Sequence, residues 1–579
     1  MSQVLNTMIW RIRRMMTPAI LRDELENALG SSVRSIWGDR IPDEFRAVVS
    51  GSKNLEFGDI SCQAAMRLAG ILKDNPHSIA GRITEALTDS VEWISSISID
   101  GPGFINFRFS DDYLASTAFN LAACGLQSFL PDKGAGREVL IEFVSSNPTG
   151  PLTVGHCRQA VLGETISSLL CASGWKVSRE YYFNDTGRQM NLLGESLCAR
   201  YLSAPGCDAV IPEDGYHGSY IIEWASDLRA EHGAGLTWKS DRDTFIRFAE
   251  DKAMKMIMSD LSLLGIEFDR FFAESELIPD AVTDAIEKLS RITVDGKSLV
   301  YKDEAGKLWL RFTALGRPKD RVIIRDNGTY TYRMPDIAYH LDKFSRNYDL
   351  MVDIFGADHL DTSRDVTAAL ESLLGRERVS DRLKVIIHQF VTLVKDGRKI
   401  KMSTRSGEFV TLRELISDVG SSDVTKYLFL TRRAEAHMDF DLDLARMQSS
   451  ENPVFYVQYA HARIAGILRA AGEAGINSPP EFSGDISSLL SGEYERELMR
   501  LLESVPVQVA AAADEMEPHR LTEILADLAT GFHRFYQHVL VVDSDNRDVS
   551  EARLVLCRAC RRCISDLLGI LGVDAPDTM

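Results

Sequence analysis

The chain has 579 residues, of which 45% are hydrophobic and 26% are charged, a composition typical of an ordinary globular protein with several domains. No run of about 18 apolar residues occurs, so no membrane span is expected. The net charge of −19 argues against non-specific binding to nucleic acid. It leaves room for a specific nucleic-acid partner, because such a partner needs only local basic patches.

The first 17 residues form an extension that begins with the basic segment MSQVLNTMIWRIRRMM. This segment has neither an apolar core nor a small-residue cleavage site, so it is not a secretory signal. Two interpretations stay open: translation starts at Met15 or Met16, or the segment is an organellar address or an RNA-contacting arm. Without a secretory signal, the nine cysteines are expected to be free thiols in a reducing compartment, and the protein is expected to be cytoplasmic.

Residues 18–112 are predicted to form an N-terminal α+β domain. Two helical patterns, MRLAGILKD and SIAGRITEALTDSV, precede the short alternating strands ISSISID and FINFRFS, which a Gly-Pro-Gly turn separates. A polar, glycine-rich stretch at 131–138 then marks a domain boundary. The sequence thus predicts a compact first domain that ends before the next strand pattern begins.

Between residues 137 and 445, strand patterns alternate with helical ones, which predicts an α/β domain with a mostly parallel sheet. An Asn-Gly pair between two β-rich runs, in RVIIRDNGTYTYR, predicts a hairpin. From residue 446 to 579, strand patterns vanish and helical periodicity dominates, so the C-terminal domain is expected to be all-helical. The strand patterns are EVLIEFV, KVSREYYF, LVYK, LWLRF, RVIIRDNGTYTYR, DLMVDIFG and KVIIHQFVTLVK.

The first of these strands leads into SSNPTGPLTVGH, residues 145–156, and then into a helical pattern. The free N–H groups and the dipole of a helix start attract phosphate, and Gly155 would let a ligand approach the backbone closely. A nucleotide site is therefore predicted at His156. The standard phosphate loops are missing from the sequence: the Gly-Lys-Ser triplet at 296–298 has Arg291 in place of the leading glycine, and GAGREV lacks the third glycine of GxGxxG.

The stretch LTVGH resembles the first signature, HxGH, of class I aminoacyl-tRNA synthetases, and RKIKMSTRSGEF at 398–409 resembles the second, KMSK. Further stretches narrow the resemblance to the arginyl-tRNA synthetase family: PGFINF, REYYFNDTGRQ, DGYHGSYI, TYTYRMPDIAYH, FGADH and FYVQYAHARI. The resemblance covers nearly the whole chain after residue 17. It implies a tRNA-binding add-on domain at 18–112, a Rossmann-like catalytic domain with an insertion at 137–445, and a helical anticodon-binding domain at 446–579.

The resemblance also implies an activity, the ligation of L-arginine to tRNA(Arg). In this reaction arginine joins the α-phosphate of ATP, pyrophosphate leaves, and the arginyl group passes to the 2′-hydroxyl of the terminal adenosine. Two alternatives are a non-catalytic paralogue that only binds tRNA and a class I ligase for another amino acid. ATP is expected to arrive with Mg²⁺, no dedicated protein metal site is expected, and the protein is expected to be a monomer without a membrane partner.

The two signatures supply the residues that the resemblance assigns to ATP. His156 and Lys401 are implied to be catalytic, because both would stabilise charge on the phosphates. Two positions depart from the family pattern: Thr153 stands where a histidine is common, and Thr404 replaces the second lysine of KMSK. The full set implied to bind ATP is Thr153, Gly155, His156, Lys401, Met402 and Ser403.

A guanidinium group is best met by carboxylates and other oxygen acceptors. Glu142 at the end of the first strand could supply one, although its residue pattern alone favours an edge-strand carboxylate that faces water. Tyr332 and Asp336 are four residues apart and could share one face of a helix. The resemblance implies that arginine is bound by Glu142, Asn147, Tyr332 and Asp336.

Three further groups of residues are candidates for function. The FGADH segment would lie at the carboxyl end of a strand, where open α/β sheets bind ligands, although an ordinary strand-to-helix cap is the alternative for its Asp-His pair. The C-terminal triplet CxxCxxC lies in a helical pattern without a fourth ligand nearby, so core cysteines are expected there rather than a metal site. The aromatic residues of FHRFYQH are likewise expected to belong to the core more than to an RNA surface. The candidates are Gly356, Asp358 and His359 for the pocket, Tyr459, His461 and Arg463 for tRNA, and no residue for metal.

Overall fold

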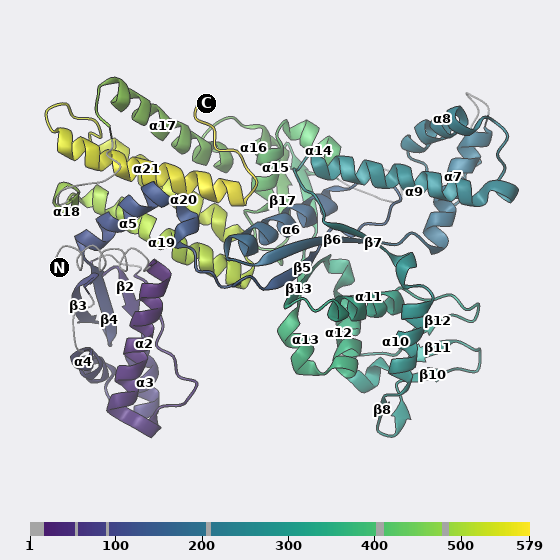
Figure 1. Ribbon diagram of the computed structural model, residues 1–579, viewed down its shortest axis with the longest axis horizontal. Coiled ribbons are helices and arrows are strands. Elements are labelled where there is room, and N and C mark those ends of the chain that lie inside the picture. Colours follow the sequence, from purple (N-terminus) through teal and green to yellow (C-terminus); the bar gives the residue numbers. More distant parts are fainter. Residues whose placement is uncertain (1–16, 53–55, 88–91, 204–209, 401–409, 478–485) are drawn as a thin grey trace, which may run out of the picture. The chain divides into compact units, whose positions relative to one another are not determined.

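The computed structural model describes residues 17–52, 56–87, 92–203, 210–400, 410–477 and 486–579. The chain forms two compact units, Met1–Lys133 with Gln448–Met579, and Gly134–Met447 (Figure 1). The extension up to residue 16 lies outside the described residues, as do the candidate residues Lys401, Met402 and Ser403. Within the described ranges, no helix has the length and apolar character needed to cross a lipid bilayer.

The N-terminal part of the first unit is an antiparallel sheet with helices packed on it, as the sequence predicts. Its strands lie in the order β1 (Val49–Gly51), β2 (Ile60–Cys62), β4 (Phe104–Phe109) and β3 (Ile94–Asp100). The helices are α2 (Pro18–Trp37), α3 (Ala64–Leu72), α4 (Pro76–Ala86) and α5 (Asp111–Cys124). The predicted turn between β3 and β4 needs Gly103, which has φ +128°, and a Cβ there would stand 2.8 Å from the carbonyl oxygen of Pro76.

The C-terminal part of the first unit is helical throughout its described residues, which confirms the prediction. It comprises α17 (Pro453–Glu473), α18 (Ile486–Leu489), α19 (Glu493–Glu515), α20 (His519–His538) and α21 (Arg547–Ile570). Helix α5 of the N-terminal part packs on α19 and α21. Cys557, Cys560 and Cys563 are buried in α21, and burial raises the pKa of the Cys557 thiol to about 12. These cysteines are core residues, as expected.

The second unit is built on a five-stranded parallel sheet in the order β14, β13, β5, β6, β7. Counted along the chain, this order is 5-4-1-2-3, the arrangement of a doubly wound Rossmann-like sheet. Helix α6 (Val154–Ala172) covers one face, and α11 (Arg333–Ser345), α12 (Leu360–Leu374) and α13 (Arg376–Arg382) cover the other (Figure 1). The strands are β5 (Glu138–Glu142), β6 (Lys176–Phe183), β7 (Arg270–Ala273), β13 (Leu350–Gly356) and β14 (Leu383–His388).

The strand order reverses between β5 and β13, and ligands bind beyond the carboxyl ends of the strands at such a switch point. Two insertions interrupt the sheet. The first is helical, lies between β6 and β7, and has its own buried core around Leu193, Leu197, Trp224 and Phe245. Its helices are α7 (Gly187–Leu202), α8 (Tyr220–His232) and α9 (Trp238–Ser262).

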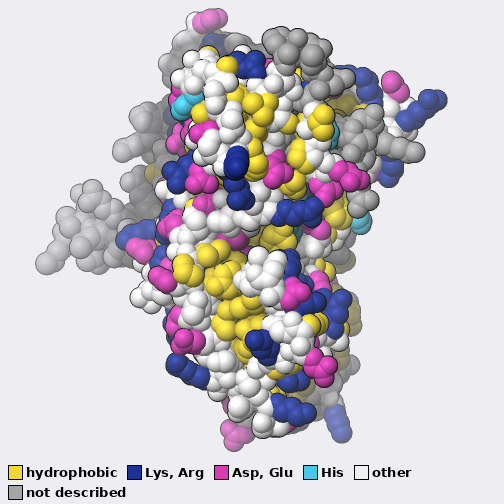
Figure 2. Space-filling view, turned by 90° about the vertical axis from the view of Figure 1, so that its right-hand side faces the viewer, with side chains coloured by type: hydrophobic (Ala, Val, Ile, Leu, Met, Phe, Trp, Pro, Cys, Tyr) yellow, Lys and Arg dark blue, Asp and Glu magenta, His cyan; other side chains and the backbone are white. Residues whose placement is uncertain are grey.

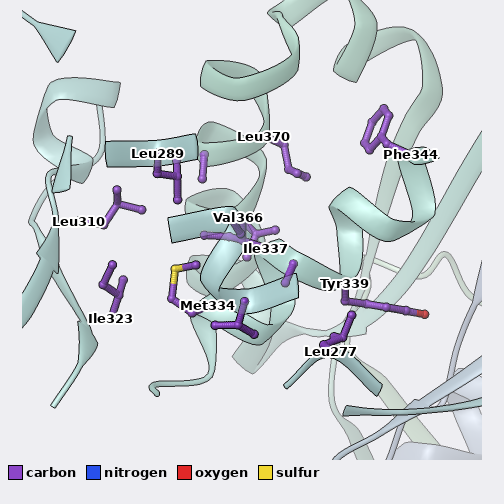
Figure 3. Packing of buried hydrophobic residues seen from close by; sticks show 14 of the residues in the cluster. Leu277, Leu289, Leu310, Ile323, Met334, Ile337, Tyr339, Phe344, Val366 and Leu370 are labelled. Carbon is purple, nitrogen blue, oxygen red and sulfur yellow. The ribbon is translucent and has the colours of Figure 1, made fainter. Parts of the chain in front are cut away.

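The second insertion lies between β7 and β13 and holds α11 in place. Side chains from α10 (Asp280–Ser290), α11, α12 and the strands β11 (Leu308–Leu310) and β12 (Arg321–Ile324) meet in one buried cluster (Figure 3). Strands β10 (Val300–Lys302), β11 and β12 form a separate antiparallel sheet, so these three patterns do not belong to the parallel sheet. The insertion also contains η3 (Glu274–Leu277), β8 (Thr293–Val294), β9 (Lys297–Ser298) and η4 (Phe312–Leu315).

Two predicted strand patterns are shorter in the structure than in the sequence. The Asn-Gly hairpin forms, with Gly328 at φ +80°, but its second arm is a single bridge between Ile324 and Tyr330 because α11 begins at Arg333. The pattern KVIIHQFVTLVK is divided between β14 and β15 (Val391–Lys395), which belong to different sheets. The remaining elements of the unit are β16 (Arg398–Lys399), α14 (Leu412–Val419), α15 (Ser422–Phe429), β17 (Met438–Asp441) and α16 (Leu442–Arg446).

Candidate functional site

The first side of the site begins where β5 ends. Glu142 is 2% exposed on a central strand, so the interpretation as an edge carboxylate that faces water is wrong. Val144 and Ser145 then adopt φ values of +66° and +41°, which are rare for residues with a β-carbon and are found at functional sites. This sharp turn lets the Ser145 hydroxyl donate to Glu142 Oε1 at 2.8 Å and accept from the amide of Tyr182 at 3.2 Å.

Three buried carboxylates lie side by side across the sheet, and we call them the acidic row: Asp353 on β13, Glu142 on β5 and Glu180 on β6. Helix α11 supplies their partners. Lys343 Nζ donates to Glu142 and to Asp353, the latter at 2.6 Å, and Arg346 makes two bonds to Glu180 at 2.6 and 2.8 Å. Because a buried charge is tolerated only when it is paired, this helix is fixed in register over the three strands.

His340 on α11 completes the charge balance of the acidic row. Its Nε2 lies 2.8 Å from Asp353 Oδ2, and its Nδ1 lies 2.7 Å from the carbonyl oxygen of Asp336. Both partners can only accept, so both ring nitrogens must donate and the imidazole is a cation. Burial lowers the pKa of His340 most strongly, but the charge of Asp353, the hydrogen bond to it and the charge of Glu142 together outweigh burial, and the pKa is raised. Three cations thus face three carboxylates.

A second group of acidic side chains faces the first turn of α11. Asp336 is half-buried, and its pKa is raised to about 7 by burial and by the charges of Glu142 and Glu274. Glu274, directly after β7, is 6% exposed and accepts from the Tyr182 hydroxyl at 2.8 Å. Tyr332 lies at the start of α11 with its side chain exposed. The arrangement suits a buried cation that would neutralise the extra carboxylates.

Glu274 was not among the candidates taken from the sequence. The signal for it is its position in FFAE, where a carboxylate directly follows a strand of the parallel sheet. Asn147, which was a candidate, is half-buried in the loop after β5. Its Nδ2 donates to Gln189 at 2.6 Å and its Oδ1 accepts from the amide of Asn184 at 3.2 Å, so it ties this loop to the one that follows β6.

The second side of the site begins at the start of α6. The amide of Thr153 donates to Nδ1 of His156 at 3.1 Å, so this nitrogen carries no proton and the proton lies on Nε2. Burial lowers the pKa of His156 to about 4, which keeps the imidazole neutral at physiological pH. The side chain is therefore a neutral donor at a helix N-terminus, where backbone N–H groups attract anions. Gly155 lies beside it in the same turn.

Main-chain hydrogen bonds join the first signature segment to the residues directly after the second. The amide of Val154 donates to the carbonyl oxygen of Val410 at 3.3 Å, and the amide of Leu412 donates to the carbonyl oxygen of Leu152 at 2.8 Å. Thr153 and Thr411 form an antiparallel bridge between these bonds. The chain directly after the second signature segment is thereby fixed beside the start of α6.

The FGADH segment lies at the carboxyl end of β13. Asp358 and His359 have exposed side chains, with 3.7 Å between His359 Nε2 and Asp358 Oδ2. They form the short helix η5 (Ala357–His359) that leads into α12, so the capping position that the sequence allows is the observed one. Gly356 pairs with His388 at the end of β14. Arg158 and Gln159 of α6 donate to the carbonyl oxygens of Gln389 and Ile354, so these two strand ends lie next to the start of α6.

One buried carboxylate connects α12 to the start of α11. Asp365 on α12 has no exposed surface and accepts hydrogen bonds from three arginines, Arg317 at 2.8 Å, Arg321 at 3.1 Å and Arg333 at 2.9 Å. Arg333 is the first residue of α11. The segment after β13 and the helix that carries Asp336 are therefore held together at the carboxyl edge of the sheet.

The candidate tRNA residues of the C-terminal domain divide into exposed and buried ones. Tyr459 is 45% exposed on α17, and the guanidinium of Arg463 lies 4.5 Å from its ring centre and 5.5 Å from that of Tyr536 on α20. His533, also on α20, stands 6.1 Å from Tyr459 between ring centres. His461 is 2% exposed and bonds the carbonyl oxygen of Pro576, so its placement gives no support to RNA contact.

Comparison with known protein families shows the class of protein to which the chain belongs. Three family models match: "Arginyl tRNA synthetase N terminal domain" over residues 19–109, "tRNA synthetases class I (R), catalytic domain" over 125–203, and "DALR anticodon binding domain" over 457–579. With the Rossmann-like sheet and the two signature motifs of the sequence, they define a class I aminoacyl-tRNA synthetase.

Relatives then define the family. The chain is 42% identical to an arginine–tRNA ligase of Desulfotalea psychrophila over 94% of this chain and 96% of the relative, and 41% identical to one of Salinibacter ruber over 93% and 97%. The structure of Thermus thermophilus arginyl-tRNA synthetase shares the fold, with a TM-score of 0.74 and 21% identity over 96% of this chain and 100% of that one. The chain belongs to the arginyl-tRNA synthetase family, as its sequence motifs predict.

Proposed function

We propose that this chain ligates L-arginine to tRNA(Arg) through an arginyl-adenylate formed from ATP. One observation carries the proposal: an acidic pocket and an anion-attracting helix start face the carboxyl ends of the same sheet, on the two sides of its switch point. The two halves match the two small substrates, a cationic amino acid and a nucleotide triphosphate. The sequence supplies both family signatures in support.

The arginine side is assigned to the first turn of α11 and the ends of β5 and β7. Asp336 and Glu274 face the guanidinium, whose planar donors suit carboxylates. Glu142 has two of about four acceptor sites in use and can still accept from the substrate ammonium group. The assigned set is Glu142, Asn147, Glu274, Tyr332 and Asp336.

The ATP side is assigned to the start of α6, to FGADH and to the second signature. His156 donates from Nε2 to the phosphates, where charge develops as the arginine carboxylate displaces pyrophosphate. Lys401 is assigned the opposite side of the same phosphates. Mg²⁺ is expected to neutralise part of the phosphate charge, and among the described residues no group of three or more histidine, cysteine or acidic side chains is placed to hold a metal. The remaining assigned residues are Thr153, Gly155, Gly356, Asp358, His359, Met402 and Ser403.

The arginyl group would then pass to the 2′-hydroxyl of the terminal adenosine of tRNA(Arg). For the anticodon end of the tRNA we assign the exposed surface formed by Tyr459, Arg463, His533 and Tyr536, because aromatic rings and a guanidinium plane offer faces on which bases stack. A compact surface of this kind does not require a basic protein. On the face drawn in Figure 2, the described Lys and Arg side chains are interspersed with Asp and Glu.

Substitution of the aromatic residues tests that surface. Tyr459→Ala and Tyr536→Ala should each raise the KM for tRNA(Arg), and stacking on one base is worth about 1–3 kcal/mol, or roughly 5- to 150-fold. Tyr459→Phe keeps the ring and should bind nearly as tightly as the natural chain. Equal KM values for all three variants would place the anticodon elsewhere. We further propose that the protein acts as a monomer in the cytoplasm.

The activity itself is tested by exchange of pyrophosphate into ATP, with and without tRNA(Arg). Arginine should support exchange when tRNA is present, because family members need tRNA even for activation. Citrulline, which has the shape of arginine without its charge, should support none because the pocket is acidic. Absence of exchange with arginine and tRNA, while tRNA still binds, would favour a non-catalytic paralogue.

A further inference from the structure

The loop that joins β5 to α6 is held in place by the first insertion. This loop, residues 146–153, lies between the strand that ends at Glu142 and the helix that begins at Val154, and we call it the β5–α6 loop. The insertion consists of α7, α8 and α9 (Figure 1), and each helix supplies one side chain to the loop. The contacts join Gln189 on α7 to Asn147, Tyr220 on α8 to the carbonyl oxygen of Thr149, and Asp260 on α9 to the amide of Leu152.

The β5–α6 loop receives little support from its own main chain. Within residues 147–151, the described main-chain hydrogen bonds amount to one, from the amide of Thr149 to the carbonyl oxygen of Asn147 at 2.8 Å. Ser146 is bonded to the Tyr181 hydroxyl of the sheet, through its amide at 3.1 Å and its carbonyl oxygen at 2.8 Å. Beyond Ser146, the position of the loop therefore depends largely on side chains of the insertion.

Tyr220 is the first residue of α8, and its ring packs against the core of the insertion. The ring centre lies 4.8 Å from the ring centre of the buried Trp224. The hydroxyl donates to the carbonyl oxygen of Thr149 at 2.9 Å. A Cβ at Gly150 would stand 2.7 Å from the hydroxyl oxygen and 3.1 Å from the ring carbon that bears it. The absence of a side chain at Gly150 thus makes room for the tyrosine.

Asp260 lies in the last turn of α9 and is 1% exposed. Its Oδ2 accepts from the amide of Leu152 at 3.3 Å, and its Oδ1 accepts from Nε of Arg413 at 3.1 Å. Arg413 is in the first turn of α14, shortly after the bridge between Thr153 and Thr411. A buried carboxylate is tolerated only when its oxygens are paired. Asp260 therefore ties the insertion to both segments that meet at this bridge.

The groups at the two ends of the β5–α6 loop are assigned to different substrates. Asn147, near the start of the loop, is assigned to arginine, and His156, just after its end, is assigned to the phosphates of ATP. Activation requires the arginine carboxylate to lie close to the α-phosphate, and a displacement of about 1 Å can lower a rate by about 10²-fold. The loop therefore sets the distance between the two groups that hold the reactants.

We propose that Tyr220 and Asp260 are positioning residues for the activation step. They fix the β5–α6 loop so that Asn147 and His156 hold arginine and ATP in the reactive alignment, and they act through the loop rather than on a substrate. This assignment rests on the proposed function. It gives the helical insertion, which contains neither signature, a part in setting the rate of adenylate formation.

The test is the rate of arginyl-adenylate formation in a single turnover, with tRNA(Arg) present and both small substrates saturating. Tyr220→Phe removes one neutral hydrogen bond and should lower the rate by about 3- to 10-fold. Asp260→Asn should lower it by about 10- to 100-fold, because one of its two donors loses a charged acceptor. The KM values for arginine and ATP should change little, because the substrate contacts remain. Asp251→Asn alters an exposed carboxylate of α9 that pairs with Lys255, and it should match the natural chain.

A second pair of variants isolates the contact between Tyr220 and the loop. Gly150→Ala places a methyl group against the Tyr220 hydroxyl and should lower the rate by about tenfold. The backbone does not oppose this substitution, because Gly150 has no positive φ. In a Tyr220→Ala background the same methyl group meets no ring, so it should cause no further loss. Losses that multiply in full would overturn the contact. These variants also decide the matter if Asp260→Asn fails to fold.

Deuterium uptake distinguishes this proposal from the proposed function. The amide of Leu152 is bonded to Asp260, so its uptake should rise in Asp260→Asn and stay unchanged in Asp251→Asn, whether or not the chain charges tRNA. An unchanged rate in Tyr220→Phe or in Asp260→Asn would overturn the role of that residue, and so would a raised KM for arginine at an unchanged rate. A natural chain that forms no adenylate, while Leu152 responds as expected, would instead refute the proposed function.

Discussion

The acidic row and the carboxyl ends of β13 and β14 differ in how their buried polar groups are paired. The three carboxylates of the row, which crosses β13, β5 and β6, meet the cationic side chains of His340, Lys343 and Arg346 on α11 and directly after it, so the row is complete without a ligand. At the carboxyl ends of β13 and β14, the Nε2 atom of His388 has no partner within the described residues and Asp358 is exposed.

This difference fits what each side has to recognise. An amino acid side chain must be distinguished from close analogues, and discrimination of that kind needs acceptors held in fixed positions before the substrate arrives. ATP brings its own charges and its own hydrogen-bond donors. The part of the site that binds ATP can therefore leave hydrogen-bond acceptors unpaired. Such groups contribute to the affinity for the nucleotide rather than to the rigidity of the protein.

The largest expected effect comes from removing a cation from the acidic row. Lys343→Met leaves Glu142 and Asp353 buried without their shared cation, and removal of one partner from a buried ion pair costs about 3–5 kcal/mol. Native-state hydrogen exchange should show the free energy of opening of α11 falling by about this amount. The matched control is Lys288→Met, which removes an exposed ion pair to Asp284 and should change stability by about 0–1 kcal/mol. Equal protection of α11 in both variants would contradict the proposed role of the acidic row.

The next largest effect is expected at the start of α6, where the phosphates of ATP are assigned. His156→Ala should slow formation of arginyl-adenylate by about 10²–10³-fold, the range seen when one preorganised donor to developing charge is removed. The fold should persist, because the helix start keeps its main-chain bonds to Val410 and Leu412. Single-turnover kinetics with tRNA present would show a lower rate with little change in the KM for ATP. A changed KM with an unchanged rate would mean that His156 binds the ground state only.

A smaller effect is expected at the acidic pocket, and it depends on pH. The pKa of Asp336 is raised to about 7, so this carboxyl group is largely protonated at pH 6 and ionised at pH 8. The guanidinium binds the ionised form, so the dissociation constant for arginine should fall about fivefold from pH 6 to pH 7, about twofold more by pH 8, and level off above. Calorimetric titration with arginine between pH 6 and pH 8 measures this.

Asp336→Asn is the control for that profile. It removes the titrating group, so arginine should bind about 10- to 100-fold more weakly at pH 8, the effect of losing a hydrogen bond to a charged group, and this affinity should hardly change with pH. A pH dependence that survives in the variant would assign the titration to another residue, such as His340.

The smallest effect is expected for Thr153→Ala. The bond that orients His156 comes from the main-chain amide of Thr153, and alanine keeps it. The hydroxyl lies 3.3 Å from the same ring nitrogen, so its loss should lower the rate of adenylate formation several-fold at most. If Thr153→Ala proves as damaging as His156→Ala, the hydroxyl replaces the missing family histidine in the chemistry.

The sequence predicts the elements of the site well but not its lateral contacts. A helix start at His156 and a strand end at Glu142 follow from local patterns. The acidic row does not, because Glu142, Glu180 and Asp353 become neighbours only through the order and register of three strands. The run of strand residues through His388 likewise conceals that β14 ends there, since the break falls within a continuous apolar pattern.

The candidate tRNA residues show where local geometry would have improved the prediction. Residues four apart on a helix share a face, whereas residues two apart do not. Tyr459 and Arg463 accordingly lie together at the surface, and His461 between them turns into the core. The FHRFYQH segment divides in the same way: Phe532 and Phe535 are buried, as expected, but Tyr536 is exposed.

The main-chain bridge between the start of α6 and the residues directly after the second signature also makes the site observable. The amide of Val154 is bonded to Val410, so within the first turn of α6 it is unavailable to a phosphate, which is left with the amides of Gly155 and His156. The exchange of its proton with solvent requires the segment from Val410 to Leu412 to separate from the helix start. Val154 is therefore a natural reporter residue: its deuterium uptake, compared with and without ATP, measures how often the segment after the second signature separates from the start of α6.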